Sequence, residues 1–494
     1  MIGSFTKLFR PHTILTDRER ETALYIIGQP GCGKSRFIES LAWQDIISGN
    51  GVAVIDPAGD LYKRLVYRLM ARPDLWSKVV LIDPCTSDWL VQLNPLMAFR
   101  GVEPQRVAMF FSDMVERIWK IDPTQSPRMA WVMKNAFLAL AAAGLTLLDL
   151  PNFLLDKDFR DAHLGTLPPE QQAVRTFFTL EYPKTRGGAR MWSTPILNKL
   201  GALVFDQDIR AMLSGNHSLD FRQVMDDRLI VLANLPKGLI GEGTSTLVAA
   251  FIVAQFQKAA MSRADTEPDS VHKRPLYFLY LDEFQNYTTD NITMILDESR
   301  KYRLSLILAH QYLEQLSMNL RSSVLHTSGT MAVMRVGYND AQQLARYIYP
   351  SFDYQARSET SYGVQGIGHL HYLQVNQRPA LVGWDGLVQR LANQELRYFW
   401  LRRKGGHEPM QLRTKDTPQF DVTPDLLKRV RELQQVSGQQ YGLPRAKARE
   451  EVLARDQAQA TSAKPFVSKP RTKEKSESKK TKEEVKGKTK VKAE

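Results

Sequence analysis

The chain has 494 residues, 43% of them hydrophobic and 24% charged, and a formal net charge of +13. A chain of this length forms two or three domains with a large core, and this composition is that of an ordinary soluble protein. Its two cysteines, Cys32 and Cys85, lack metal-ligand spacing and suggest no disulfide framework, which favours a reducing, cytosolic setting.

No segment has the roughly 18–20 consecutive apolar residues that a membrane-spanning helix requires. The best candidate, Ala136 to Leu148, contains Gly144 and Thr146 and is predicted to be a buried core helix. Residues 1–10 lack the apolar stretch of a signal peptide. We therefore expect a cytoplasmic protein without a transmembrane segment.

The most informative motif follows the apolar run Leu24–Ile27, which predicts a strand. The next eight residues match the phosphate-binding pattern Gly-x4-Gly-Lys-Ser, and residues 34–47 have a helix-like pattern. In this context the glycines let backbone amides surround phosphate groups, and the helix N-terminus attracts negative charge. The predicted nucleotide-binding residues are Gly28, Gln29, Pro30, Gly31, Cys32, Gly33, Lys34 and Ser35.

The last two residues of this motif have specific expected roles. Lys34 would neutralise the β- and γ-phosphates of ATP, and the Ser35 hydroxyl would bind Mg²⁺. The alternative is a chance match on a glycine-rich turn, but the flanking strand and helix patterns argue against it. The sequence therefore predicts a nucleotide site.

Strands are expected next near Val52–Asp56 and Val79–Asp83. Residues 101–213 then show the apolar spacing of helices and no strand runs, as in Trp131 to Leu150. This stretch predicts an all-α domain inserted into an α/β core, whose strands resume near Leu229–Ala233.

The apolar run Leu276–Leu281 is unbroken, as in a strand buried on both faces of a parallel sheet. Asp282 and Glu283 follow it directly. Asp282 is predicted to hold Mg²⁺ opposite Ser35, and Glu283 to accept a proton from an attacking water, which favours hydrolysis. Alternatively, the acidic pair caps the helix after the strand.

A further buried strand is predicted over Leu304–Ala309, and His310 and Gln311 follow it. Gln311 is a candidate for contact with the γ-phosphate, with an ordinary loop glutamine as the alternative. A strand near Met331–Val336 and short exposed helices over residues 425–436 and 445–460 complete the predicted elements.

Strands and helices alternate in two blocks, which predicts an α/β fold with a parallel sheet covered by helices. The expected domains are an N-terminal lead (1–22), the first part of the core with the phosphate-binding loop (23–100), the inserted helical domain (101–213), the second part of the core (214–350), a C-terminal core or accessory region (351–440), and a helical then disordered basic tail (441–494).

The last 31 residues, 464–494, contain twelve Lys or Arg and five Glu, and so carry more than half of the net charge. Few apolar residues occur among them, which predicts disorder. A solvated tail and an arm that docks to nucleic acid or a partner both remain open.

Several motifs besides the phosphate-binding loop support a family resemblance over residues 15–350. They are Asp17-Arg18, Gly51–Asp60 (Gly-Val-Ala-Val-Ile-Asp-Pro-Ala-Gly-Asp), Val80–Pro84, Leu93–Leu96, Leu229–Leu235, Leu281–Asn286 (Leu-Asp-Glu-Phe-Gln-Asn) and Ala309–Tyr312. The chain resembles the FtsK/HerA group of hexameric DNA-pumping ATPases, and most closely relatives of type IV secretion (conjugative) coupling proteins. The string Asp-Glu-Phe-Gln-Asn is the more specific signal, because a very wide superfamily shares the phosphate-binding loop.

The resemblance implies a RecA-like P-loop core, a ring of six subunits, and ATP- and Mg²⁺-dependent movement of DNA through the central hole. It also implies that an arginine of the neighbouring subunit stabilises the γ-phosphate charge. By its position after the acidic pair, Arg300 is the first candidate for this catalytic arginine, with Arg303 and Arg321 behind it. For each of them, an ordinary surface ion pair is the alternative.

The chain departs from the family at Ala58, where the family usually has a histidine in Asp-Pro-His-Gly-Asp. Membrane-anchored coupling proteins carry N-terminal transmembrane helices, and HerA-type proteins carry a small N-terminal β-barrel. Here about 22 residues precede the first predicted strand. Docking to a secretion channel is therefore an open question.

Together these features predict an ATP-hydrolysing DNA translocase or helicase-like motor that forms a homo-hexamer. It would contact mainly the DNA backbone, with weak sequence specificity, and a secretion or relaxosome-type complex would be a further partner. The alternatives are an ATPase that drives a protein cargo in a secretion machine and a nucleotide-gated assembly factor with little hydrolysis.

Overall fold

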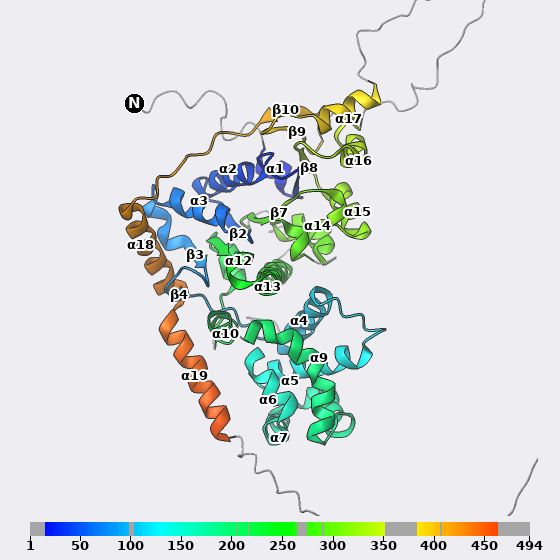
Figure 1. The fold of residues 1–494 in the computed structure, drawn as a ribbon, viewed down its shortest axis with the longest axis vertical. Helices are drawn as coiled ribbons and strands as arrows, with labels where there is room; N and C mark the ends of the chain where they lie inside the picture. Colours follow the sequence, from blue (N-terminus) through cyan, green and yellow to red (C-terminus); the bar gives the residue numbers. More distant parts are fainter. Residues whose placement is uncertain are drawn as a thin grey trace, which may run out of the picture.

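The computed structural model describes residues 15–97, 103–204, 206–215, 217–263, 274–288, 291–350, 383–405 and 408–462. Its upper part in Figure 1 is built on a nine-stranded sheet with the strand order β10-β9-β8-β1-β7-β6-β2-β5-β3. Its strands are β1 (Leu24–Ile27), β2 (Gly51–Asp56), β3 (Val79–Ile82), β5 (Ile230–Asn234), β6 (Tyr277–Asp282), β7 (Leu304–His310), β8 (Thr330–Val333), β9 (Tyr398–Arg402) and β10 (Met410–Arg413).

The sheet is parallel from β8 to β3, and β9 and β10 add an antiparallel edge. A separate two-stranded sheet joins β4 (Trp89–Leu90) to β11 (Leu443–Pro444). The helices of the core are α1 (Asp17–Arg20), α2 (Lys34–Ile47), α3 (Asp60–Leu69), α11 (Phe221–Asp226), α12 (Lys237–Ile240), α13 (Glu242–Ser262), α14 (Asn291–Tyr302), α15 (Met318–Thr327), α16 (Tyr338–Ile348) and α17 (Trp384–Ala392).

Both faces of the parallel sheet are buried, which explains the unbroken apolar runs of its strands. Alternate side chains of a strand point to opposite faces. Leu24 and Ile26 of β1 accordingly belong to the core that α2 and α3 cover, whereas Tyr25 and Ile27 belong to the core around α13. All residues of β1 and β6 are buried, so the predicted doubly covered strands are confirmed.

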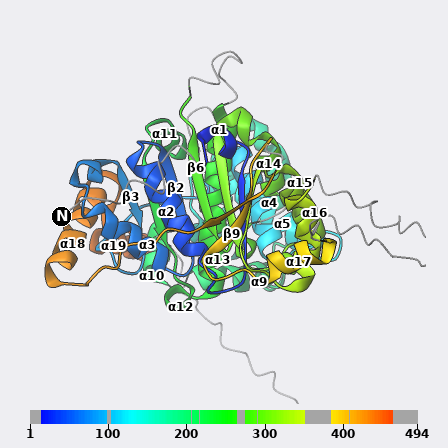
Figure 2. The ribbon, with the colours of Figure 1, turned by 90° about the horizontal axis from the view of Figure 1, so that it is seen from above.

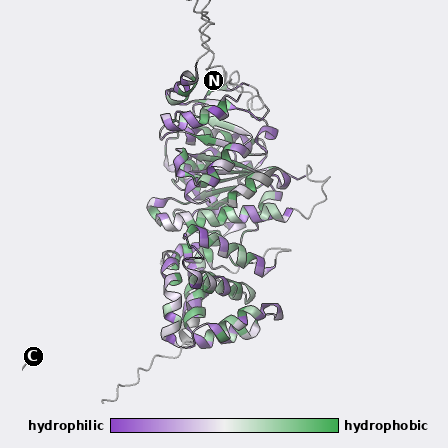
Figure 3. Cartoon of the chain, turned by 90° about the vertical axis from the view of Figure 1, so that its right-hand side faces the viewer, coloured by the Kyte–Doolittle hydropathy of each residue, from purple (hydrophilic) through white to green (hydrophobic). Residues whose placement is uncertain are grey.

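Between β4 and β5, the described residues form helices only. Figures 1 and 3 show most of these helices as a second part of the molecule on the far side of α13 from the sheet. They are α4 (Pro104–Ile118), α5 (Pro127–Ala142), α6 (Leu150–Leu155), α7 (Lys157–Thr166), α8 (Gln172–Thr176), α9 (Arg186–Val204) and α10 (Gln207–Leu213), followed by α11 of the core.

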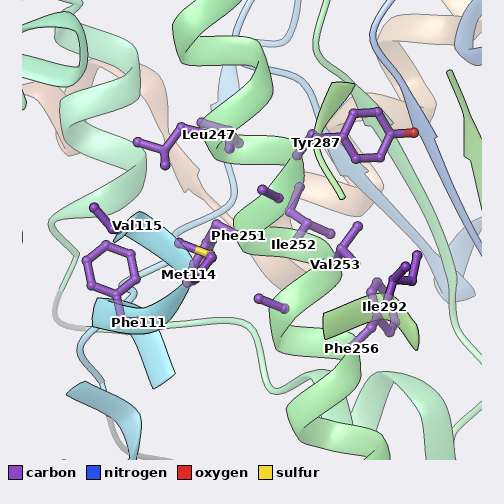
Figure 4. Close-up of a cluster of buried hydrophobic side chains, with 14 of the residues drawn as sticks. Phe111, Met114, Val115, Leu247, Phe251, Ile252, Val253, Phe256, Tyr287 and Ile292 are labelled. Carbon is purple, nitrogen blue, oxygen red and sulfur yellow. The ribbon is translucent and has the colours of Figure 1, made fainter. Parts of the chain in front are cut away.

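Helix α13 joins the two parts, because it is apolar nearly all round and buried along most of its length. Figure 4 shows Phe111 and Met114 of α4 beside Phe251 of α13, and Ile292 beside the lower part of the same helix. The rings of Phe111 and Phe251 meet edge to face with their centroids 6.4 Å apart. One continuous apolar core therefore runs from the sheet into the helical part.

Two C-terminal helices, α18 (Pro424–Tyr441) and α19 (Arg445–Ser462), follow the β3 side of the molecule from the sheet to the helical part (Figures 1 and 2). The carboxylate of Asp208 in α10 accepts hydrogen bonds from Arg445 at 2.8 Å and Arg449 at 2.7 Å. Arg210 of the same helix binds Asp456 at 2.8 Å. These ion pairs fasten α19 to the helical part.

The predicted α/β class is confirmed, and most element boundaries agree within a few residues. Helix α2 spans the predicted residues 34–47, whereas β5 begins and ends one residue later than predicted and β8 ends three residues earlier. Helices α18 and α19 are longer than predicted, at 18 residues each. Residues 351–382 and the expected disordered tail lie outside the described residues, and the domain boundaries stay predictions.

Across the described ranges, no helix combines the length and the apolar character that crossing a bilayer requires.

Replacing Asp208 by Asn is expected to loosen α19. Asp208 is only 13% exposed and binds two arginines, and loss of such charged hydrogen bonds costs about 1–3 kcal/mol. Limited trypsin cleavage at Arg445 and Arg449 should therefore accelerate at least about fivefold, since local opening controls cleavage. As a control, Asp161→Asn removes an exposed partner of Lys157 and should leave the cleavage rate unchanged. Equal rates for the two variants would show that Asp208 does not hold α19.

Candidate functional site

The phosphate-binding pattern forms a tight loop between β1 and the first turn of α2. Gly31 and Gly33 have φ angles of 77° and 109°, a region that glycine adopts without steric cost. A Cβ on Gly28 would lie 2.7 Å from Cys32 Sγ, so the loop closes this tightly only with glycine there. Pro30 and Gly31 are exposed at its rim.

The Lys34 side chain is buried inside this loop. Its Nζ donates hydrogen bonds to Gly28 O at 2.6 Å and to Gln29 O at 3.2 Å. The first amides of α2 have no partner within the helix and carry its positive dipole end. The loop thus presents an ammonium group and backbone N–H groups together, as phosphate binding requires.

Ser35 and Asp282 meet although 247 positions separate them. Ser35 Oγ donates to Asp282 Oδ2 at 3.1 Å, and Asp282 Oδ1 accepts from Glu283 N at 3.0 Å. A hydroxyl and a carboxylate are ligands that suit Mg²⁺, which usually takes one or two carboxylates and completes its shell with phosphates and water. Within the described part of the chain, no group of three or more His, Cys, Asp or Glu forms a metal cage. The donor set therefore fits Mg²⁺ bound together with a nucleotide.

The acidic side of the site brings buried carboxylates close together. Burial, and then the charge of Asp56, raises the pKa of Asp282 to about 6, against the lowering effects of Lys34 and Ser35. Burial also raises the pKa of Asp56, whose Oδ1 accepts from the Ala58 amide at 2.9 Å. Ala58 itself, where the family has histidine, leaves its side chain exposed. A divalent cation would offset the negative charge of Asp56 and Asp282.

Glu283 and Gln311 lie together at the ends of their strands. Gln311 Nε2 donates to Glu283 Oε1 at 2.5 Å, and Gln285 and Asn286 approach Glu283 Oε2 at 3.4 Å. Glu283 has a φ of 53°, an uncommon angle for a residue other than glycine, which costs on the order of 1–3 kcal/mol. A strained backbone at Glu283 and the side-chain amide of Gln311 thus fix the position of the Glu283 carboxylate.

Sequence reasoning missed the residues that position Gln311. Gln315 Oε1 accepts hydrogen bonds from the amides of Gln311 and Tyr312 at 3.1 and 3.2 Å. The residue before Gln311, His310, is buried at the end of β7, where its ring forms a hydrogen bond with Tyr25 OH at 2.5 Å. Burial lowers the pKa of His310 to about 3. The neutral imidazole is therefore a structural group at ordinary pH.

The three candidate arginines lie in different places. Arg303 precedes β7, at the opposite end of that strand from Gln311, and binds Glu21 at 2.5 Å. Arg321 is half-buried on α15. Arg300 belongs to α14, but its side chain lies outside the described residues. The choice of a catalytic arginine stays a prediction.

No family model matches the sequence, and no curated protein matches it. Among solved structures, the unbound bacterial conjugative coupling protein TrwBdeltaN70 has a TM-score of 0.53 at 12% identity, over 83% of this chain and 88% of that chain. The plasmid coupling protein TrwB in complex with ADP and Mg²⁺ also has a TM-score of 0.53, at 13% identity, over 82% and 88% of the two chains. This chain has the coupling-protein fold.

The VirB4 protein of Thermoanaerobacter pseudethanolicus is a more distant match, with a TM-score of 0.48 at 16% identity over 80% of this chain and 90% of that chain. The match to the coupling proteins confirms the predicted P-loop core and the predicted resemblance at the level of fold.

Asp282→Asn is expected to stabilise the free protein above pH 6. The pKa of Asp282 is about 6 in the fold and near 3.9 when unfolded, so stability falls as the pH rises from about 4 to 6 and then stays low. The variant lacks this loss, which amounts to about 2–3 kcal/mol above pH 6. Thermal unfolding without nucleotide should show a higher midpoint for the variant at pH 7.5 and equal midpoints near pH 4.

A matched control is Asp122→Asn, because Asp122 is exposed and its hydrogen bonds with Thr124 lower its pKa. This variant should show no gain at pH 7.5. A gain of the same size for both variants would contradict the assignment to Asp282.

Proposed function

We propose that this chain is an ATP-hydrolysing DNA translocase, a helicase-like motor of the conjugative coupling-protein type that acts in the cytoplasm as a homo-hexamer. The observation that carries this proposal is the hydrogen bond between Gln311 and Glu283 at the strand ends beside the Ser35–Asp282 pair. A protein that only bound a nucleotide would not need a strained carboxylate held at this position.

ATP and Mg²⁺ fit the residues that line the site. The backbone amides of residues 28–35 and the Lys34 ammonium would hold the β- and γ-phosphates, and Ser35 and Asp282 would hold Mg²⁺. When bound, Mg²⁺ would neutralise part of the phosphate charge. TrwB, with the same fold, has been solved with ADP and Mg²⁺ and with ATP and GTP analogues that cannot be hydrolysed.

Glu283 is the proposed general base. Its carboxylate accepts a proton from water, and the Gln311 amide orients it through Oε1. Since Gln311 follows β7, between the strands of the phosphate-binding loop and the acidic pair, its side chain can also contact the γ-phosphate. Loss of that phosphate would then alter the position of Glu283 and Gln311 together.

In the proposed hexamer, a neighbouring subunit would supply the catalytic arginine. Arg303 is engaged with Glu21 at the far end of β7, so it is not available to the site of its own subunit. A neighbour's arginine, with Arg300 as the first candidate, would complete the charge stabilisation around the γ-phosphate.

The proposed cargo is DNA, on the basis of the coupling-protein fold and the net charge of +13. Binding would depend mainly on phosphate contacts, and its affinity would fall steeply with salt. A relaxosome or secretion complex would then be a further partner of the motor.

Steady-state ATP hydrolysis with and without single- and double-stranded DNA tests this proposal. DNA should stimulate turnover, Lys34→Ala should abolish it, and Glu283→Gln should lower it about 100- to 10,000-fold with little loss of ATP binding, because only the proton acceptor is removed. Turnover that DNA does not change would favour a protein cargo. ATP binding without turnover, or an unaffected Glu283→Gln variant, would favour a nucleotide-gated assembly factor.

A further inference from the structure

The β9–β10 segment, residues 395–405 and 408–417, lies against the phosphate-binding loop. Arg397 N donates to Cys32 O at 2.9 Å, and the Arg36 guanidinium binds the Thr417 hydroxyl. A Cβ on Gly33 would lie 3.5 Å from both Cα and Cγ of Arg397. A segment distant in sequence thus contacts Cys32 and Gly33 of the loop and Arg36 of the helix that follows.

Arg397 has a backbone conformation that residues other than glycine rarely adopt, with a φ of 74°. Two backbone hydrogen bonds hold it there: its own N–H donates to Cys32 O, and Thr414 N donates to its carbonyl at 2.7 Å. Strained residues of this kind cluster at active sites and ligand-binding sites, so the position of the Arg397 side chain points to a binding role. The first part of the side chain runs along Gly33, beside the loop that would hold phosphate.

The surroundings of Arg397 carry excess positive charge. Burial lowers the pKa of Arg36, and the like charges of Arg64 and Arg397 lower it further, while Glu39 opposes them. The buried Glu39 has Arg68 as its near partner at 2.7 Å, with Arg36 and Arg64 at 3.8 and 3.7 Å. One carboxylate thus faces several guanidinium groups next to the phosphate-binding loop.

The ion-pair partner of Arg397 is Asp416, whose side chain is 73% exposed. An exposed ion pair is worth only about 0–1 kcal/mol, so a phosphate oxygen can displace this carboxylate. Arginine is well suited to that exchange, because its planar fork fits carboxylate and phosphate alike.

We propose that the Arg397 side chain binds the phosphate chain of the nucleotide in the same subunit and that Asp416 holds it when the site is empty. This inference rests on the proposed ATP site and adds a binding residue from outside its motifs. Asp416 therefore competes with the nucleotide for Arg397. The β9–β10 segment becomes part of the nucleotide site.

The test measures the affinity of the full chain for Mg-ADP and for a non-hydrolysable ATP analogue. Arg397→Ala should weaken binding of both nucleotides about tenfold, since it removes a charged hydrogen bond but keeps the backbone N–H that binds Cys32. Asp416→Asn should strengthen binding about two- to fivefold by freeing the guanidinium. The matched control is Arg413→Ala, which removes a neighbouring cation 3.9 Å from Asp416 and should change affinity less than twofold.

The two variants are independent arms of the test. Unchanged affinity in a folded Arg397→Ala protein would overturn the proposal, as would equal losses for Arg397→Ala and Arg413→Ala, which would indicate only a general charge effect. If Arg397→Ala does not fold, Asp416→Asn decides, and no gain in affinity would overturn the proposal. Failure of the ATP site itself is distinguishable, because the wild-type chain would then bind neither nucleotide.

Discussion

The geometry of the candidate site depends on one constraint, the order of parallel strands around β7. Parallel strands end at a common edge of the sheet, and β7 pairs with β1 on one side and β6 on the other. The phosphate-binding loop, Gln311 and the acidic pair each follow one of these three strands. Hydrogen bonds across that edge, from Ser35 to Asp282 and from Gln311 to Glu283, follow from this order rather than from any local sequence feature.

A second consequence of this arrangement is electrostatic. Asp56 and Asp282 end neighbouring strands, and both are buried, so their ionised forms destabilise the free protein. The strained Glu283 backbone adds to that cost. The rest of the fold offsets both through two apolar cores, one on each face of the sheet. The site is thus preorganised for a cation and a phosphate at the expense of stability.

The sequence predicted the residues at the strand ends well, because unbroken apolar runs followed by polar residues identify doubly buried strands and their tips. The contact between Gln311 and Glu283 was not predictable, since no local pattern shows which strands are neighbours. Gln315 and Arg397 were missed for a related reason. Gln315 binds the backbone amide of Gln311, and Arg397, whose role is proposed, binds the backbone carbonyl of Cys32. Both contacts form only when the chain folds. The proposed arginine of a neighbouring subunit is harder still to predict, because its position would depend on how subunits assemble.

The site also has a short, rigid connection to the helical part. Leu235 N donates to Asp56 O, and Lys237 N donates to Pro57 O, each at 3.1 Å, so the segment after β5 follows the loop beside the acidic group. Ser245 Oγ of α13 then binds Leu235 O at 2.6 Å. Helix α13 packs in turn on α4 through Phe251 and Phe111. Because every step is a hydrogen bond or a packed apolar contact, the acidic group of the site and α13 are connected without a loose linker.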